Sequence, residues 1–167
     1  MSVECKICGV TDDAALQAAI SGGARWVGFV FYPPSPRSLS LDQAAHLAAQ
    51  AEGRIERVGL FVDPDDALLE ETLQRVQLDA LQLHGAESPR RVAEIRARWQ
   101  LPVMKAIKIA REPDLEAVAD YAGVVDRILF DAKAPKDMVG ALPGGNALSL
   151  DWRLIAGRQW PRLWMLS

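Results

Sequence analysis

The chain has 167 residues, half of them apolar, and 19 basic against 22 acidic residues give it a net charge of −3. This length and composition predict one globular domain over residues 1–167, and the charge balance gives no reason to expect a nucleic-acid partner. No apolar run reaches the roughly 20 residues that span a membrane, and no cleavable segment opens the chain, so we expect a cytoplasmic protein with no membrane contact.

Short apolar runs typical of strands recur along the chain and alternate with helical stretches. The runs cover residues 3–8, 26–31, 57–62, 79–84, 102–107, 126–131 and 162–166. Helices are expected within 11–23, 39–53, 63–76, 87–99 and 111–123, the second with Ser40 as its N-cap. This alternation predicts βα units around a parallel sheet whose strands are covered on both faces.

A βα unit roughly every 20 to 30 residues favours an α/β fold of the (β/α)8 TIM-barrel type. A doubly wound open sheet is the alternative, but its dinucleotide-binding form is weakened because no G-x-G-x-x-G follows the first run. We count seven strands, and the seventh runs almost to Ser167. The sequence therefore predicts an incomplete barrel that lacks its eighth βα unit and is cut short at strand 7.

Cys5 and Cys8 form a C-x-x-C pair within the first strand run. Side chains alternate along a strand, so these two point to opposite faces and are poorly placed to share a metal or form a disulfide. No second C-x-x-C and no histidine pair completes a zinc site, so no metal is expected. We expect Cys5 to be a small buried residue under a helix, and Cys8, at the strand's end, to be either catalytic or a packing residue.

Two charged residues follow other strand runs. Asp131 closes an apolar run, where a carboxylate is costly to bury without a role or a partner. The alternatives are a helix N-cap or a structural ion pair, for which Lys133 is one candidate partner. Arg37 lies in a proline-stiffened loop after the second run and suits a planar carboxylate, which a guanidinium grips with two hydrogen bonds. The alternative for Arg37 is an ordinary solvated side chain.

Histidines and glycines supply the remaining candidates. His84 ends the fourth run and either contacts substrate or bonds to the backbone, the second being favoured by residue type alone. His46 sits within a helical stretch as a surface or core residue. Gly144 and Gly145 give the loop at 142–152 unusual backbone freedom, as a cover over a pocket requires, and no G-K-[ST] follows to make it a P-loop.

The motifs KICGVT, WVGFVFYPPSPRS, VGLFVD, LQLHG, LFDAK and LPGGN…DW, in this order, closely resemble phosphoribosylanthranilate isomerase of tryptophan biosynthesis over essentially the whole chain. The resemblance implies a (β/α)8 barrel that converts N-(5-phosphoribosyl)anthranilate into 1-(2-carboxyphenylamino)-1-deoxyribulose 5-phosphate. This Amadori rearrangement is an internal redox reaction and needs no cofactor. The implied partner is this phosphorylated small molecule, for a protein that is a monomer or a homodimer.

The resemblance also implies a role for each candidate. Asp131 matches the acid that protonates the furanose ring oxygen, and Cys8 matches the base that removes the proton from the neighbouring carbon. Arg37 matches the contact to the anthranilate carboxylate, and the loop with Gly144 and Gly145 matches the flexible cover.

The end of the chain departs from the family pattern, in which strand 7 continues into a glycine turn and an eighth strand whose loops hold the phosphate. Two hypotheses follow: an isomerase with an incomplete chain, or an inactive fragment or non-enzymatic interaction domain without a phosphate site. We expect the 167 residues alone to be weakly stable and nearly inactive. A third hypothesis is another sugar-phosphate barrel isomerase. A substrate without a carboxylate would not need Arg37.

Overall fold

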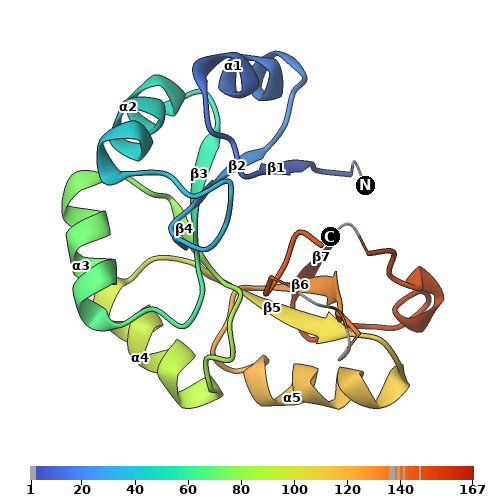
Figure 1. Ribbon diagram of the computed structural model, residues 1–167. Coiled ribbons are helices and arrows are strands. Elements are labelled where there is room, and N and C mark those ends of the chain that lie inside the picture. Colours follow the sequence, from blue (N-terminus) through green and yellow to red (C-terminus); the bar gives the residue numbers. More distant parts are fainter. Residues whose placement is uncertain (1–2, 136–137, 139, 141, 147) are drawn as a thin grey trace. The chain divides into compact units, whose positions relative to one another are not determined.

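The structure is a computed structural model that describes residues 3–135, 138, 140, 142–146 and 148–167. The chain divides into two compact units, residues 1–82 and 83–167. In the described residues, each predicted apolar run carries a strand, coloured blue to red in chain order in Figure 1. No helix among them is long and apolar enough to cross a membrane.

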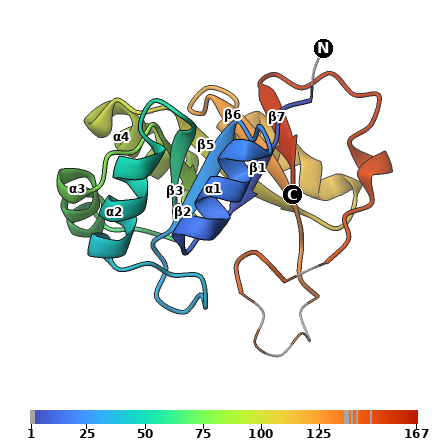
Figure 2. The same ribbon diagram turned by 90° about the horizontal axis from the view of Figure 1, so that it is seen from above.

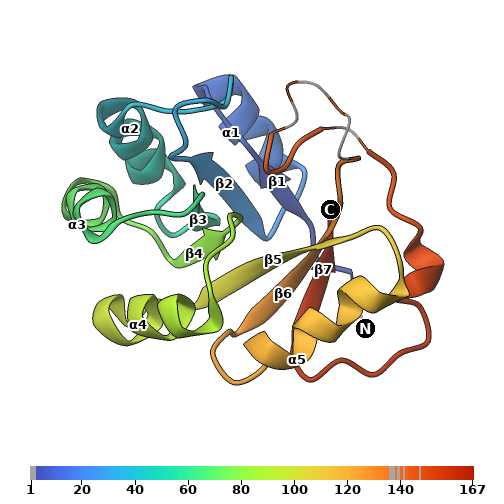
Figure 3. The ribbon, with the colours of Figure 1, turned by 60° about the horizontal axis from the view of Figure 1, so that its bottom comes forward.

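The first unit is a run of parallel strands with helices between them. Its strands are β1 (Lys6–Cys8), β2 (Trp26–Val30), β3 (Glu56–Phe61) and β4 (Ala80–Leu83), the last ending at the unit boundary. β2 pairs in parallel with both β1 and β3, and Gly28 is the partner of Cys8. The helices α1 (Asp13–Ser21), α2 (Leu41–Ala51) and α3 (Asp66–Arg75) lie along the outer side of these strands (Figure 3).

Local sequence signals set where these helices begin. The side chains of Asp12, Ser40 and Asp65 each accept a hydrogen bond from a backbone N–H in the first turn of the helix that follows. Gln43 completes a capping box with Ser40, which confirms the N-cap predicted for α2. All five residues of β2 are buried, as expected for a strand covered on both faces.

The second unit holds α4 (Pro89–Trp99), β5 (Val103–Ile109), α5 (Ala117–Tyr121), β6 (Arg127–Ala132) and β7 (Leu163–Leu166). β6 pairs in parallel with β5 and β7, and Lys108 is the partner of Asp131. The single helix expected at 111–123 is split, because a 3-10 helix (Glu112–Glu116) with Pro113 in its first turn precedes α5. A second 3-10 helix (Trp152–Leu154) stands away from β6 and β7 (Figure 2).

The expectation for Cys5 is wrong. The strand β1 begins only at Lys6, and the Cys5 side chain is exposed rather than packed under a helix. Its backbone carbonyl accepts hydrogen bonds from the backbone N–H groups of Arg25 and Trp26. Cys5 and Cys8 are both free thiols.

In both units, an aspartate just before a strand forms hydrogen bonds that join this strand to its neighbour. Asp79 precedes β4; its backbone N–H donates to the Arg57 carbonyl at 2.8 Å, and its carboxylate accepts from the Arg57 N–H at 2.7 Å. The Arg57 guanidinium adds bonds of 2.8 and 2.9 Å, and these lower the pKa of Asp79. Arg57 also donates to the Ala48 carbonyl, which ties β3 to α2.

Asp126 forms the corresponding hydrogen bonds just before β6. Its backbone N–H donates to the Val103 carbonyl, and its carboxylate accepts from the Val103 N–H, both at 2.9 Å. Burial alone would raise the pKa of Asp126, but hydrogen bonds from Arg96 on α4 and from Val103 lower it overall. Both carboxylates thus join the amino ends of neighbouring strands to an arginine.

We predict that Asp79→Asn lowers the free energy of unfolding by about 2 kcal/mol, less than the loss of a fully buried partner because Asp79 is partly exposed. The variant leaves the guanidinium of Arg57, whose side chain is only 10% exposed, without its anionic partner. Urea denaturation measures the change. Asp42→Asn is the control, because Asp42 also pairs with an arginine but is 87% exposed and should cost less than about 0.5 kcal/mol. Equal losses for the two variants would contradict the prediction.

Candidate active site

Cys8 and Arg37 meet in the first unit. Cys8 is the last residue of β1 and is partly buried, and Arg37 Nη1 donates to the Cys8 carbonyl oxygen at 3.4 Å. The loop that carries Arg37 is held by its own backbone bonds: Ser35 N–H donates to the Tyr32 carbonyl, and Ser38 N–H donates to the Ser35 carbonyl. These bonds agree with the prediction of a rigid loop, and the structure places the guanidinium at the end of β1, which the sequence did not predict.

Gly9 lies beside Cys8 and Arg37, and it was not among the candidate residues predicted from the sequence. Its φ of +79° lies in the left-handed region, and a Cβ built on it would lie only 2.6 Å from Arg37 Cδ. The aliphatic stem of Arg37 therefore lies directly against the Gly9 backbone. The glycine after the cysteine in KICG was the available signal, because a turn directly after a strand often requires positive φ.

Gly28 on β2 has no side chain and so leaves room for two side chains of β1. Lys6 and Cys8 are two residues apart and so share a face of the strand. A Cβ on Gly28 would lie 3.0 Å from Lys6 Nζ and 3.1 Å from Cys8 Sγ. The thiol therefore has an ammonium group on its own face of the strand, and Gly28 leaves room for both.

His84 and Asp131 meet in the second unit and are the most buried of the candidates. His84 Nε2 lies 2.9 Å from Asp131 Oδ2, and the two side chains are 6% and 10% exposed. Asp131 lies within β6, so it is not a helix N-cap, and Lys133 Nζ donates to Asp114 instead. A structural ion pair stays open as an alternative, with His84 rather than Lys133 as the partner. His84 Nε2 contacts the Asp131 carboxyl group, and the backbone bond favoured for His84 stays a prediction.

The loop with Gly144 and Gly145 reaches this pair. A Cβ on Gly144 would lie 2.4 Å from His84 Nε2, so the loop backbone lies against the imidazole ring. Asn146 closes the loop, because its side chain accepts from the Leu142 N–H at 2.9 Å and donates to the Leu142 carbonyl at 2.7 Å. Gly145 takes a φ of +75° at this bend. Residue 147 of the predicted cover lies outside the described residues.

Asp114 links the segments that follow β5 and β6. Its carboxylate accepts from Lys133 Nζ at 2.7 Å and from the backbone N–H groups of Ala110 and Arg111 at 2.9 and 3.1 Å. The bond from Lys133 and those from the backbone lower the pKa of Asp114 to about 2. Asp114 thus fixes the carboxyl end of β5 to the residue that follows β6.

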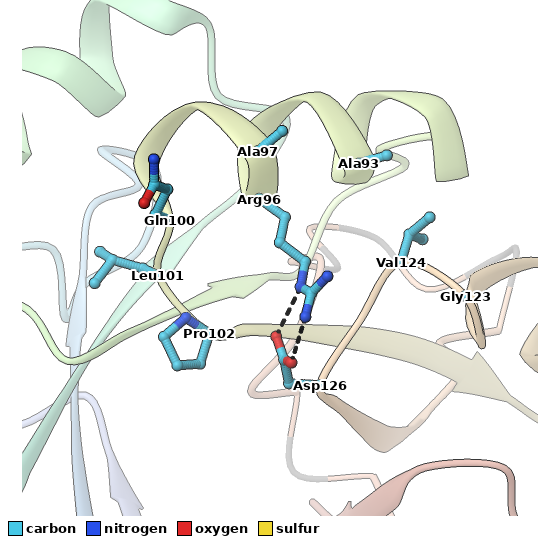
Figure 4. A pocket seen from close by; sticks show the side chains of 9 residues that line it. All are labelled: Ala93, Arg96, Ala97, Gln100, Leu101, Pro102, Gly123, Val124 and Asp126. Atoms are coloured by element: carbon cyan, nitrogen blue, oxygen red, sulfur yellow. Dashed lines mark hydrogen bonds and ion pairs between the residues drawn. The ribbon is translucent and has the colours of Figure 1, made fainter.

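An open pocket of about 380 Å³ lies elsewhere in the second unit (Figure 4). It is lined by the end of α4 and by residues just before β5 and β6, among them Pro102 and Asp126, with the Arg96–Asp126 ion pair in its wall. No candidate residue lines it. Because barrel chemistry belongs to the carboxyl ends of strands, this pocket at the amino ends is not the active site.

Parallel βα units, with an acid, an imidazole, a thiol and a guanidinium at or just beyond strand carboxyl ends, define a barrel enzyme of the acid–base type. Within the described residues, no group of three His, Cys, Asp or Glu side chains is arranged to hold a metal. The comparisons with known proteins agree with this class and narrow it.

A family model described as N-(5'-phosphoribosyl)anthranilate (PRA) isomerase matches residues 5–164. The N-(5'-phosphoribosyl)anthranilate isomerase of Paramagnetospirillum magneticum is 54% identical over the whole chain, which spans 77% of that relative. The crystal structure of phosphoribosyl anthranilate isomerase from Thermotoga maritima has a TM-score of 0.79 and 34% identity over 92% of this chain and 70% of that one.

A further solved isomerase of this name holds reduced 1-(o-carboxyphenylamino)-1-deoxyribulose 5-phosphate, with a TM-score of 0.73 and 33% identity over 79% of this chain and 66% of that one. The chain belongs to the N-(5'-phosphoribosyl)anthranilate isomerase family. The predicted fold class, an incomplete (β/α)8 barrel, is confirmed, as are the isomerase class and its place in tryptophan biosynthesis.

We predict that Asp114→Asn destabilises the protein near neutral pH and that the difference from the parent chain disappears in acid. Because the folded-state pKa of Asp114 is lowered from its usual 3.8 to about 2, its stabilising effect is fully present above pH 4. The effect is lost as the pH falls from 4 towards 2. Urea denaturation of both chains across this window measures the gap. A gap that stays constant with pH would contradict the assignment.

We predict that Gly144→Ala lowers kcat/KM at least roughly tenfold, because the new methyl group must displace either the His84 ring or the loop. Steady-state kinetics measures the loss. Gly123→Ala is the matched control: Gly123 has open space around its Cβ position, so activity should be unchanged. Equal activities of the two variants would show that the loop does not position the imidazole.

Proposed function

We propose that this chain catalyses the Amadori rearrangement of N-(5-phosphoribosyl)anthranilate with Asp131 as the acid and Cys8 as the base. Family membership supports the reaction, and the buried 2.9 Å contact between His84 and Asp131 is the observation that carries the assignment of the acid. Asp131 lies near the carboxyl end of the apolar strand β6, and its side chain is almost completely buried beside the imidazole.

The reaction runs by proton transfers alone. Asp131 donates its proton to the furanose ring oxygen, the bond from that oxygen to C1 breaks, and the nitrogen lone pair forms a C=N bond to C1. The Cys8 thiolate then takes the proton from C2, which gives an enolamine. Tautomerisation places a proton on C1 and leaves a ketone at C2, so C1 is reduced as C2 is oxidised. No external oxidant, reductant or cofactor is needed.

His84 is proposed to hold the acid rather than the substrate. Its Nε2 can accept a hydrogen bond from the protonated carboxyl group or, as the other tautomer, donate one to the carboxylate left after ring opening. In either state the ring fixes the orientation of Asp131. The contact of Gly144 with the same ring couples the loop to this acid.

Arg37 is proposed to bind the anthranilate carboxylate. Its bond to the Cys8 carbonyl and its packing on Gly9 restrict the long side chain before substrate arrives, which lowers the entropy cost of the contact. Gly144 and Gly145 complete the proposed binding residues as parts of the cover.

The proposal extends to the whole chain. Residues 1–167 act as one domain, in the cytoplasm, on a phosphorylated small molecule, as a monomer or a homodimer, with no nucleic-acid or membrane partner. The competing function is an interaction domain that keeps barrel motifs without turnover. The two functions are distinguished by whether growth depends on both Cys8 and Asp131.

Expression of the chain should support growth of a tryptophan auxotroph that lacks this isomerase, either as it stands or extended by the segment that follows strand 7 in a relative. Cys8→Ala and Asp131→Ala should each abolish that growth, because loss of an acid or base costs roughly 100- to 10,000-fold. Cys5→Ala is the matched control, since Cys5 is an exposed thiol with no proposed role. Growth that survives either substitution would contradict the assigned roles, and failure of both soluble versions would favour the interaction domain.

A further inference from the structure

Lys105 is a charged residue in the middle of an apolar strand. It lies on β5, and its side chain is 2% exposed. Met104 and Ala106 pack with Leu129 on one face of β5, so Lys105 projects from the other face. A buried ammonium is costly unless it is paired and hydrogen-bonded, so its contacts need an explanation.

The contacts of Lys105 converge on the loop that begins at His84. Its Nζ donates to the Gly85 carbonyl at 2.9 Å and to the Leu83 carbonyl at 3.4 Å. These are the carbonyl groups of the residues directly before and directly after His84. The same Nζ bonds to Glu87 Oε2 at 2.9 Å, and Glu87 is 1% exposed.

Glu87 closes the arrangement from the other side. Its Oε1 accepts from the Gly85 N–H at 3.0 Å, so both backbone groups of Gly85 are bound by the ion pair. Tyr121 on α5 donates from its hydroxyl to the Glu87 carbonyl at 2.8 Å, and its ring centroid lies 5.7 Å from Lys105 Nζ. Burial and the charge of Glu87 raise the pKa of Tyr121, which keeps the phenol protonated as a donor.

We propose that Lys105, with Glu87, is a positioning residue that fixes the backbone on both sides of His84 and so sets the His84–Asp131 contact. The expected effect on turnover rests on the proposed function. The expected effect on the position of the His84 ring does not depend on that function. A simple stabilising pair could hold any part of the loop. This one holds the peptide groups that flank the imidazole, and a misplacement of about 1 Å at a catalytic group can cost roughly 100-fold.

The first test reads the imidazole itself in Lys105→Met, which removes the ammonium and keeps a long side chain. The chain has two histidines, so the nitrogen NMR signals of His46 serve as an internal control for those of His84. We expect the His84 signals to shift and those of His46 to stay. Should Lys105→Met fail to fold, the double variant Lys105→Met with Glu87→Gln, which removes both buried charges, takes its place. Unchanged His84 signals in a folded variant would overturn the proposal, whether or not the chain is active.

The second test is a double-mutant cycle in the active protein, at a temperature where every variant is folded. Lys105→Met should lower kcat roughly 10- to 100-fold with little change in KM. The same substitution in a His84→Ala background should cost less than about threefold, because its effect passes through the imidazole. Arg57→Met is the control, since it breaks another ion pair, that of Arg57 with Asp79, and Arg57 has no part in the proposed site, so its kcat should be unchanged. Effects of Lys105→Met and His84→Ala that multiply would show a separate, merely structural role.

Discussion

The hydrogen bond between His84 and Asp131 is the constraint on which the rest of the second unit depends. Two polar side chains that are almost completely buried need each other as partners, because an unpaired polar group in that position would cost several kcal/mol, by an estimate of about 2 to 7. Each partner is in turn held by separate structure. Asp131 is fixed within β6, which pairs on both sides, and His84 is fixed through the backbone groups bound by Lys105 and Glu87. The orientation of Asp131, the proposed acid, is therefore set by the fold itself.

In the first unit, glycines position the candidate side chains. Its two candidate side chains, Cys8 and Arg37, are only partly buried, and neither forms an ion pair among the contacts described here. Gly9 and Gly28 position them instead by leaving out a Cβ: one lets the stem of Arg37 lie on the backbone, and the other gives Lys6 and Cys8 a common space. The candidate side chains of the first unit are thus placed by the shape of neighbouring glycines, whereas the proposed acid of the second unit is placed by a buried hydrogen bond.

The sequence predicted the elements well because their signals are local. Ser40 and Gln43 form the expected capping box, and the apolar runs became strands with shifts of a few residues at their ends. The failures come from tertiary contacts that no local pattern encodes. Cys5 alternates correctly with Cys8 along the chain, but β1 begins one residue later and leaves it exposed.

The site shows the same division. Cys8, Arg37, His84 and Asp131 stand at or beyond strand ends, so residue type and place were enough to make them candidates. Their partners were not predictable in this way, because the pairing of His84 with Asp131 joins residues 47 apart in sequence. Lys105 carried a usable signal, a lysine inside the apolar run 102–107, but its meaning depends on carbonyl groups some 20 residues earlier in the chain.

The two aspartates of the β6 segment show how surroundings divide one residue type between stability and chemistry. Asp126, at the amino end, bonds to a guanidinium and a backbone N–H, which favour its anion and lower its pKa. A carboxylate held in that way cannot serve as a proton donor near neutral pH. Asp131, at the carboxyl end, has an imidazole as its partner, and this group can stand opposite either the protonated or the ionised carboxyl. Lys133, the cation closest to it in sequence, is kept on Asp114 instead. With Lys133 held by Asp114, the contact that orients the proposed acid is its hydrogen bond with the imidazole.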